Sequence, residues 1–217
     1  MDLVETIALA MGVAWASGIN LYAAVFMLGL LGSTGHITLP PDLEVLSDPL
    51  VMAAAGFMYC VEFFADKIPG VDTGWDAIHS FIRIPAGAIL AMGAVGETSQ
   101  VAQLAAFLIG GSLAAATYAT KAGSRVIINT SPEPLSNWTA SLSEDLIVIA
   151  GLWTALTYPW VFLILLLVFI LVMIWLLPKL WIAVKSVFTY IRNVFRRSSP
   201  SQLKEPTNIS ANDGVKK

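Results

Sequence analysis

The feature that most constrains this chain is a series of apolar segments, several of them close to the length needed to cross a lipid bilayer. A helix that spans the hydrocarbon core needs about 20 mostly apolar residues. Apolar stretches occupy 4–31, 49–65, 84–96, 101–122, 146–158 and 160–177. Of the 217 residues, 57% are hydrophobic and only 12% are charged, about half the charged fraction of a typical soluble domain. The sequence therefore predicts an all-α, polytopic transmembrane bundle of about six helices.

Basic residues are confined to one side of the predicted topology. If the N-terminus is cytoplasmic, the outer connections are 32–48, 97–100 and the turn at Pro159. None of them contains Lys or Arg, whereas all 12 basic residues lie in or beside 66–83 and 123–145, or after Leu177. Cytoplasmic loops of membrane proteins carry an excess of Lys and Arg. We therefore expect a multi-pass protein with both termini in the cytoplasm.

The net charge and the first residues argue against two interpretations of the chain, a nucleic-acid-binding protein and a protein whose first apolar stretch is a cleaved secretory signal. The net charge is −3 and no folded segment carries a basic stripe, which argues against a nucleic-acid partner. The N-terminus contains Asp2 and Glu5, whereas a secretory signal begins with a basic region. We therefore expect the first apolar stretch to stay in the membrane. Cys60 lies in an apolar run and is expected to be a small buried side chain.

The chain divides into three predicted parts. Residues 1–178 form the transmembrane helical domain, and the polar segment 198–217 is expected to be a disordered cytoplasmic tail. Between them, 179–197 places apolar residues at helical spacing among Lys and Arg. Such a basic amphipathic helix can contact anionic lipids at the inner leaflet. The alternative is that this segment is the cytoplasmic end of the sixth helix.

Small residues indicate where helices pack closely or break. Gly111, Ala115, Ala119 and Gly123 recur every four residues, a spacing that lets two membrane helices approach closely, and a homo-oligomer is one partner that we consider. The first apolar stretch contains Gly18 and Asn20. This stretch is long enough either to tilt in the bilayer or to break near these two residues.

The first polar insert, 66–83, predicts a short helix that Asp72 or Thr73 can cap. On this helix Asp76, His79, Ser80 and Arg83 share one face. Glu62 and Asp66 are likewise one helical turn apart.

The second insert, 123–145, contains the rigid, acceptor-rich run Asn129-Thr-Ser-Pro-Glu-Pro. Ser141 and Glu144 have capping-box spacing at the expected start of the fifth helix. In that interpretation, Glu144 and Asp145 do no more than cap the helix.

The short apolar runs that follow the two inserts suggest that the inserts enter the membrane. The apolar runs 84–96 and 146–158 are only about 13 residues long, or roughly 20 Å as helix, and irregular backbone inside a membrane must be buried in protein or line a wet cavity. We therefore expect the inserts to be re-entrant on the cytoplasmic side, like the half-helices of many transporters. Each insert also has a Pro six residues before a Trp, which suggests but does not establish a duplication.

Ionisable and amide side chains of the two inserts form the candidate ligand-binding set. Its members are Glu62, Asp66, Lys67, Asp72, Asp76, His79, Arg83, Arg125, Asn129, Thr130, Ser131, Glu133, Asn137, Glu144 and Asp145. Asp72, Asp76 and His79 have the residue types for a divalent metal, but such clusters are common by chance. We predict no metal and no cofactor, and the sequence has no recognisable nucleophile–base pair.

Ionisable residues inside a membrane are costly and tend to be functional. The leading hypothesis is a transport or channel-like protein with a polar cavity built from the two inserts, handling an ion, a proton-coupled solute or a lipid headgroup. One alternative is a structural or scaffold protein that docks a partner, in which these charges only close the bundle. A second alternative is a membrane enzyme acting on a lipid headgroup.

Three motifs resemble a known family. The runs that begin at Phe64 (FADKIPGVD), Trp75 (WDAIHSFIR) and Asn129 (NTSPEPLSNW) are similar to those of the bacterial membrane family called domain of unknown function 4126. The resemblance extends from about Ala16 to about Leu180. The family often has Pro-Pro where this chain has Ile84-Pro85. The resemblance implies a bacterial inner-membrane protein and carries no activity with it.

Overall fold

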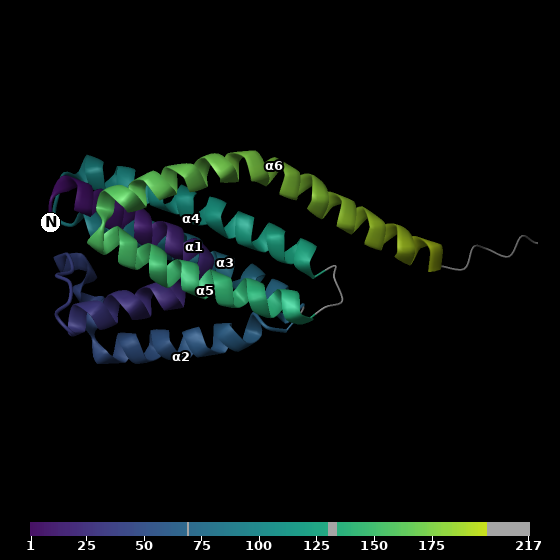
Figure 1. Cartoon of the computed structure of the whole chain (residues 1–217), viewed down its shortest axis with the longest axis horizontal. Coiled ribbons are helices and arrows are strands. Elements are labelled where there is room, and N and C mark those ends of the chain that lie inside the picture. Colours follow the sequence, from purple (N-terminus) through teal and green to yellow (C-terminus); the bar gives the residue numbers. More distant parts are fainter. Residues whose placement is uncertain (69, 130–133, 199–217) are drawn as a thin grey trace, which may run out of the picture.

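The apolar stretches form helices in the computed structural model, which describes residues 1–68, 70–129 and 134–198 (Figure 1). In chain order the elements are α1 (Leu3–Ser33), the 3-10 helix η1 (Pro41–Ser47), α2 (Pro49–Ala65), α3 (Val71–Val95), α4 (Gln100–Ile128), α5 (Pro134–Thr157) and α6 (Pro159–Ser198). No strand occurs within the described residues. The predicted all-α class is confirmed.

Five helices, α1 and α3 to α6, are long and apolar enough to cross a membrane. η1 and α2, taken together, are also long and apolar enough to cross a membrane, with a bend of 67° between them. Large apolar side chains cover the outside of the bundle, as at Phe57, Ile109 and Leu165, where lipid would solvate them. These properties make the chain a multi-pass membrane protein.

α1 enters the bundle and returns to the end from which it came (Figure 1). In its first half, Gly12 approaches Ala155 near the end of α5. In its second half, Gly29 approaches Leu46 and Met52, near the start of α2. Met1 and Thr6 accordingly line one pocket with Thr38 to Pro41 and Gly96 to Thr98. α1 is therefore a re-entrant helix pair, although its length is sufficient for a span.

This return of α1 separates the two ends of the bundle. The N-terminal end carries the N-terminus, η1, the α3–α4 turn and the start of α6, whereas the insert end carries the end of α2, the start of α3, the end of α4 and the start of α5 (Figure 1). The expectation that the N-terminus lies on the side of the inserts is wrong, because the first apolar stretch does not cross. Of the two alternatives for this stretch, a tilt or a break near Gly18 and Asn20, the structure has the break.

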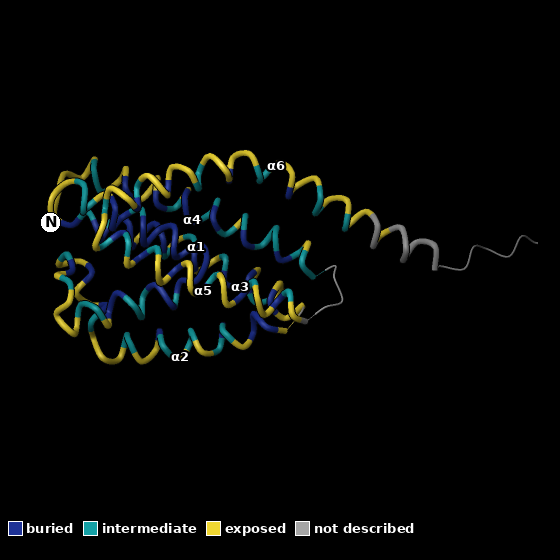
Figure 2. Tube along the Cα trace, viewed as in Figure 1, coloured by how far each residue is buried: buried dark blue, intermediate teal, exposed yellow. Residues whose placement is uncertain are grey.

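Asn20 makes the break in α1. Its φ and ψ are −146° and 95°, outside the helical region. Its side-chain Oδ1 accepts a hydrogen bond from the Ala23 N–H at 2.9 Å, so that Asn20 caps the second half of the helix as an N-cap residue does. The break also frees the Ile19 carbonyl, which accepts from Lys121. α1 is buried along most of its length (Figure 2).

The polar inserts are largely extensions of the neighbouring helices. α3 continues from Val71 through Pro85 to Val95, and α5 begins at Pro134. The described parts of the inserts are thus not separate re-entrant segments, and the apolar runs looked short only because polar residues occupy the inward face of long helices. Ser141 and Glu144 lie inside α5 and do not form the predicted capping box. Gly70, not Asp72 or Thr73, is the N-cap position of α3.

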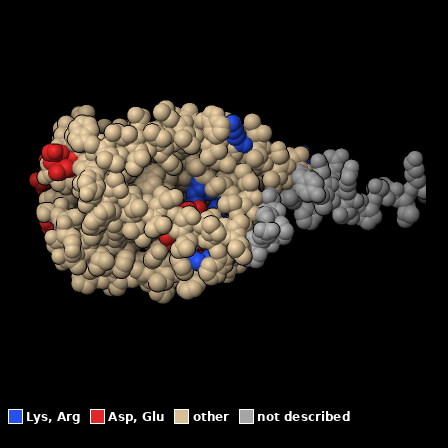
Figure 3. All heavy atoms as spheres, viewed as in Figure 1, with Lys and Arg blue, Asp and Glu red and all other residues tan. Residues whose placement is uncertain are grey.

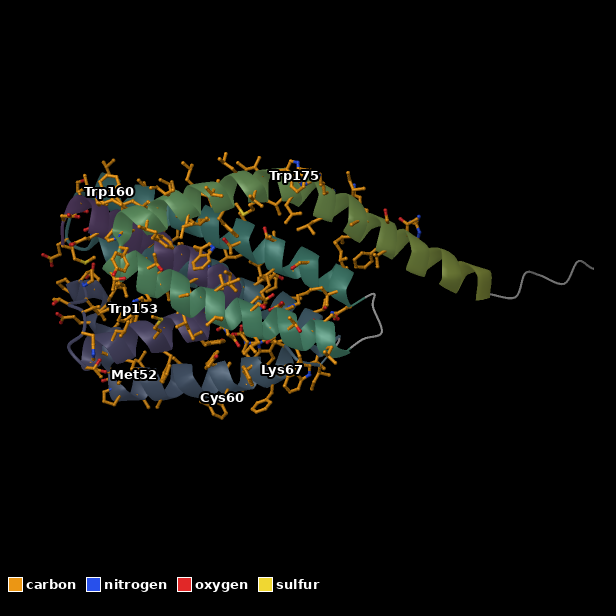
Figure 4. The ribbon with its side chains drawn as sticks, in the orientation of Figure 1. Met52, Cys60, Lys67, Trp153, Trp160 and Trp175 are labelled. Atoms are coloured by element: carbon orange, nitrogen blue, oxygen red, sulfur yellow. The ribbon has the colours of Figure 1, made fainter. Side chains whose placement is uncertain are left out.

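The last helix, α6, passes through Pro178 without ending. The segment 179–197 therefore continues the sixth helix, and contact of this segment with anionic lipid stays a prediction. Residues 199–217 lie outside the described part of the chain. Cys60 is exposed on the outer surface of α2 (Figure 4), so the expectation that it is buried is wrong.

Close helix contacts hold α1 inside the bundle. A Cβ at Gly18 would lie 2.5 Å from the Ala114 carbonyl oxygen and 2.8 Å from Thr117 Cβ of α4. The small residues Gly111 and Gly123 of α4 face Ala88 of α3 and Leu180 of α6. This part of the predicted small-residue stripe therefore packs within the chain. The core towards the N-terminal end is apolar, with Leu9, Val13 and Leu28 at 1% exposure or less.

Candidate functional site

A network of charged side chains fills the half of the bundle that lies towards the insert end. α3 shows why the side chains face inward: Asp76, His79 and Arg83 are buried, whereas Ile78 and Phe81 of the same helix are 66% and 83% exposed. A soluble helix would have the opposite arrangement, with its apolar face inside. The polar face of α3 is therefore shielded from lipid by the bundle itself.

Arg83 ties α3 to α2. Its Nη2 donates to Glu62 Oε1 at 2.6 Å, and its Nη1 donates to Asp76 Oδ1 at 2.7 Å. All three side chains are almost completely buried. A buried guanidinium is stable only when carboxylates compensate for its lost hydration, and Arg83 has two of them.

Lys121 lies where α4 meets four other helices. Its Nζ donates to Asp66 Oδ2 at 3.1 Å and to the freed Ile19 carbonyl at 3.0 Å. Carboxylate oxygens of Glu62, Asp76 and Glu144 lie 3.5 to 3.6 Å from the same nitrogen. This single ammonium thus connects the broken α1 to carboxylates of α3 and α5 and to the end of α2.

Arg125, one turn further along α4, is held mainly by α5. Its Nη2 lies 2.7 Å from Glu144 Oε2 and its Nε donates to Glu144 Oε1 at 3.2 Å, a bidentate arrangement. Its Nη1 donates to the backbone carbonyls of Asp66 and Asn137. Asp66, just after the end of α2, and the start of α5 are therefore fixed to the same guanidinium.

Asp145 differs from the other carboxylates of the network. Its Oδ1 accepts from Asn20 Nδ2 at 2.9 Å, which places it at the tip of the re-entrant α1. No Lys or Arg nitrogen of the described residues forms an ion pair with it. Its Oδ2 is buried and has no partner at hydrogen-bond distance among those residues, while the Tyr59 hydroxyl and the ammonium groups of Lys67 and Lys121 lie near enough to interact with the carboxylate.

The outer layer of the site lies near the insert end. Asn129 Nδ2 donates to both carboxylate oxygens of Asp72 at 2.9 Å, which joins the start of α3 to the end of α4. Lys67 lies in this outer layer (Figure 4). Its Nζ donates to the Phe63 carbonyl at 2.9 Å, also approaches Ser141 Oγ, and lies over the Phe63 ring. Burial lowers the pKa of Lys67 below its ordinary value.

His79 belongs to an aromatic group rather than to the ion pairs. Its Nδ1 bonds to the Trp75 carbonyl at 2.9 Å, its ring stacks on Trp75 at 4.0 Å, and Tyr22 meets it edge-on. No group of three potential metal ligands occurs within the described residues. The structure therefore does not assemble Asp72, Asp76 and His79 into a metal-binding set.

Carboxylates outnumber basic side chains in the network. The buried or partly buried carboxylates are Glu62, Asp66, Asp72, Asp76, Glu144 and Asp145, and the basic side chains are Lys67, Arg83, Lys121 and Arg125. Four carboxylate oxygens, one each on Glu62, Asp66, Asp76 and Asp145, are buried with no hydrogen-bond partner among the described residues. Such atoms are costly unless water, a proton or a cation satisfies them.

Most of the candidate residues from the sequence come together in this network. Asn137 is buried, but its side-chain amide has no partner among the described residues. Thr130, Ser131 and Glu133 lie outside the described residues. Sequence reasoning left out Lys121 and Asn20, which occupy the centre. A lysine and an asparagine inside apolar stretches were the available signal, because polar residues in a membrane span usually face the protein interior.

One comparison with known proteins identifies a relationship. The family model described as "Domain of unknown function (DUF4126)" matches residues 7–179, a range that includes every member of the charge network. No curated protein and no solved structure matches the chain.

Proposed function

The chain belongs to the DUF4126 family, and because the description of that family carries no activity, we propose from the charge network that it is a membrane transport protein. The network binds a proton or a small cation at Asp145, beside the tip of the broken helix α1. Discontinuous helices that end at a buried polar site are how many secondary transporters hold ions. The proposed membrane is the bacterial inner membrane, with the insert end in the cytoplasm.

The observation that carries this proposal is the environment of Asp145. Its side chain is buried, has no ion-pair partner among the described residues and has one unsatisfied oxygen. A buried carboxylate without a direct ion pair is costly in a low-dielectric interior, and a bound proton or cation would remove this cost. Because the six carboxylates exceed the four basic side chains of the network, the neighbouring charges do not remove this cost.

Access is proposed from the insert end. Asn137, Ser141 and Asp145 follow one another at four-residue intervals on the buried face of α5, so they form a polar stripe of about 12 Å along the helix axis. The stripe begins near Arg125 and leads to Asn20. Beyond Asn20, the same bundle axis is filled by Val13, Leu152 and other apolar side chains. An ion would therefore reach Asp145 from one side and need a rearrangement of α1 to leave on the other.

Flux in liposomes tests the proposal. The full chain is reconstituted, and proton, Na⁺ and K⁺ fluxes are measured under an imposed gradient. We expect flux above protein-free liposomes for the wild type, background flux for Asp145→Asn, and wild-type flux for Glu97→Gln, which removes an exposed carboxylate at the N-terminal end. Background flux in all three proteins, or wild-type flux in Asp145→Asn, would overturn the proposal.

A structural role of the network is the second candidate, and the short contacts of Arg83 favour it. Glu62 and Asp76 both lie within 2.7 Å of the guanidinium, as expected for charges that only close the bundle. A purely structural network predicts that Asp145→Asn changes stability and that no variant changes flux. The two candidate functions therefore differ in the ion flux that they predict for the wild type and for Asp145→Asn.

A further inference from the structure

The charge network has an opening towards the lipid. A cavity of about 240 Å³ lies among α1, α4, α5 and α6, and its lining includes Lys121 and Glu144. Glu144 is the most exposed carboxylate in the ion pairs of the network, with 19% of its side chain accessible, whereas the others are 4% exposed or less. Figure 3 shows acidic and basic side chains at the bottom of a hollow near the middle of this face, and other charged side chains at the N-terminal end and at separate points of the same face. The network is thus reachable from the side of the bundle.

An apolar groove continues from this opening. Trp15, Ile147 and Phe169 line both the opening and a second cavity of about 280 Å³ between α5 and α6. The second cavity is otherwise lined mainly by apolar side chains such as Leu165 and Leu166. Gly151 lets the indole ring of Trp15 lie directly against the backbone of α5, because a Cβ there would collide with the ring. Together the cavities form a long apolar groove that leads to a charged end.

The charged end of the groove offers mainly acceptors. Glu144 presents a carboxylate. Each of its oxygens accepts a bond from Arg125 and has a further lone pair that can accept. The hydroxyls of Thr120 and Ser124 donate to carbonyls of their own helix, which leaves their lone pairs free to accept. Lys121 is the exception, but its Nζ already donates to Asp66 and to Ile19. The ring faces of Trp15 and Phe169 at the junction also attract cations.

We propose that this groove binds lipophilic amines from the bilayer, with the aliphatic or aromatic part between α5 and α6 and the ammonium group at Glu144. The excess of carboxylates in the network selects a cationic head over an anionic one. The inference names a ligand class for the proposed transport site, and it rests on the proposed function only for the passage of the bound amine across the membrane.

Photolabelling tests binding without requiring transport. The full chain is placed in phosphatidylcholine nanodiscs with dodecylamine that carries a diazirine in its chain, and the labelled residues are mapped. We expect adducts on the α5 and α6 segments that line the groove. Unlabelled dodecylamine should compete at least about tenfold better than dodecanoic acid or dodecanol, since a charged contact contributes roughly that factor.

A matched pair of variants locates the label. Ile147 and Ile149 both lie on α5 and are 52% and 43% exposed, but only Ile147 lines the opening. Ile147→Trp should remove most of the labelling, whereas Ile149→Trp should leave it unchanged. Glu144→Gln should lower the affinity for dodecylamine about tenfold and leave that for dodecanol unchanged.

Two results would overturn the inference: equal labelling of the two tryptophan variants, or equal competition by dodecanoic acid and dodecylamine. Specific labelling without ion flux in the liposome assay would support the groove and contradict the proposed transport. Ion flux without specific labelling would support the proposed transport and contradict amine binding in the groove, so the two proposals fail separately.

Discussion

Asn20 Nδ2 donates to Asp145 Oδ1 at 2.9 Å, across 125 residues of sequence. The contact joins the tip of the re-entrant α1 to the buried face of α5. The same Asn20 side chain caps the second half of α1 through the Ala23 N–H. The Asn20 amide thus holds the helix break and also orients the Asp145 carboxylate. Asp145 is the carboxylate that has no ion-pair partner among the described residues.

Replacing Asn20 should separate these two roles. Asn20→Ala removes both bonds, and the lost cap and the unpaired buried acceptor together should lower the free energy of unfolding by about 2–3 kcal/mol. Asn20→Ser keeps a capping oxygen and should lose about half as much. Thermal unfolding of the full chain in detergent measures both. Equal midpoints for wild type and Asn20→Ala would show that the side chain does not hold the break.

Arg83 should be the most sensitive basic residue to substitution. Arg83→Met leaves Glu62 and Asp76 buried without their cation, which should cost about 3–5 kcal/mol. Adding Glu62→Gln should restore part of this loss, because one uncompensated charge is then removed. Arg192→Met, at an exposed position of α6, is the control and should stay within about 0.5 kcal/mol of wild type. A similar small change for Arg83→Met would contradict the ion-pair account.

Two glycine-to-alanine variants should change the free energy of unfolding in opposite directions. At Gly18 a Cβ would lie 2.5 Å from the Ala114 carbonyl oxygen, so Gly18→Ala should destabilise the fold by about 1–3 kcal/mol through overpacking. At Gly74 of α3 a Cβ would meet nothing within 4 Å, so Gly74→Ala should stabilise the helix by up to about 1 kcal/mol. Chemical unfolding of the two proteins measures the difference. A tolerated Gly18→Ala would mean that α1 and α4 do not approach this closely.

The re-entrant α1 predicts the labelling pattern of introduced cysteines. In a Cys60→Ser background, cysteines at Asp2 and Glu97 should react with a membrane-impermeant thiol reagent from the same side. A cysteine at Ser186, exposed on α6 towards the insert end, should react only from the other side. If the cysteine at Asp2 reacts together with that at Ser186, α1 crosses the membrane as an ordinary span.

The sequence predicts the polar face of α3 but misses the return of α1 to the N-terminal end. The face shared by Asp76, His79 and Arg83 follows from helical periodicity alone, because spacing along one helix is local. The path of α1 depends on what Ile19 and Asn20 meet after the break. Their partners, Lys121 and Asp145, are more than 100 residues away, so length and composition gave a span where the chain turns back.

The pairing of charges within the network is likewise set by contacts between residues that are distant in the sequence. Composition and the positive-inside rule place its members at one end, and their polar character predicts that they face inward. Which acid pairs with which base is set by the approach of α2, α3, α4 and α5, which no local pattern records. Glu144 illustrates this: its spacing from Ser141 fits a capping box, yet its partner is Arg125 of α4.

Infrared spectroscopy of the carboxyl groups tests the central claim most directly, namely that Asp145 holds a proton or a cation. The full chain in nanodiscs is measured at neutral pH in a buffer whose only cations are bulky organic ones. We predict absorption from a protonated carboxyl group that is absent in Asp145→Asn and unchanged in Glu97→Gln. A wild-type spectrum with no protonated carboxyl group under these conditions would contradict the account.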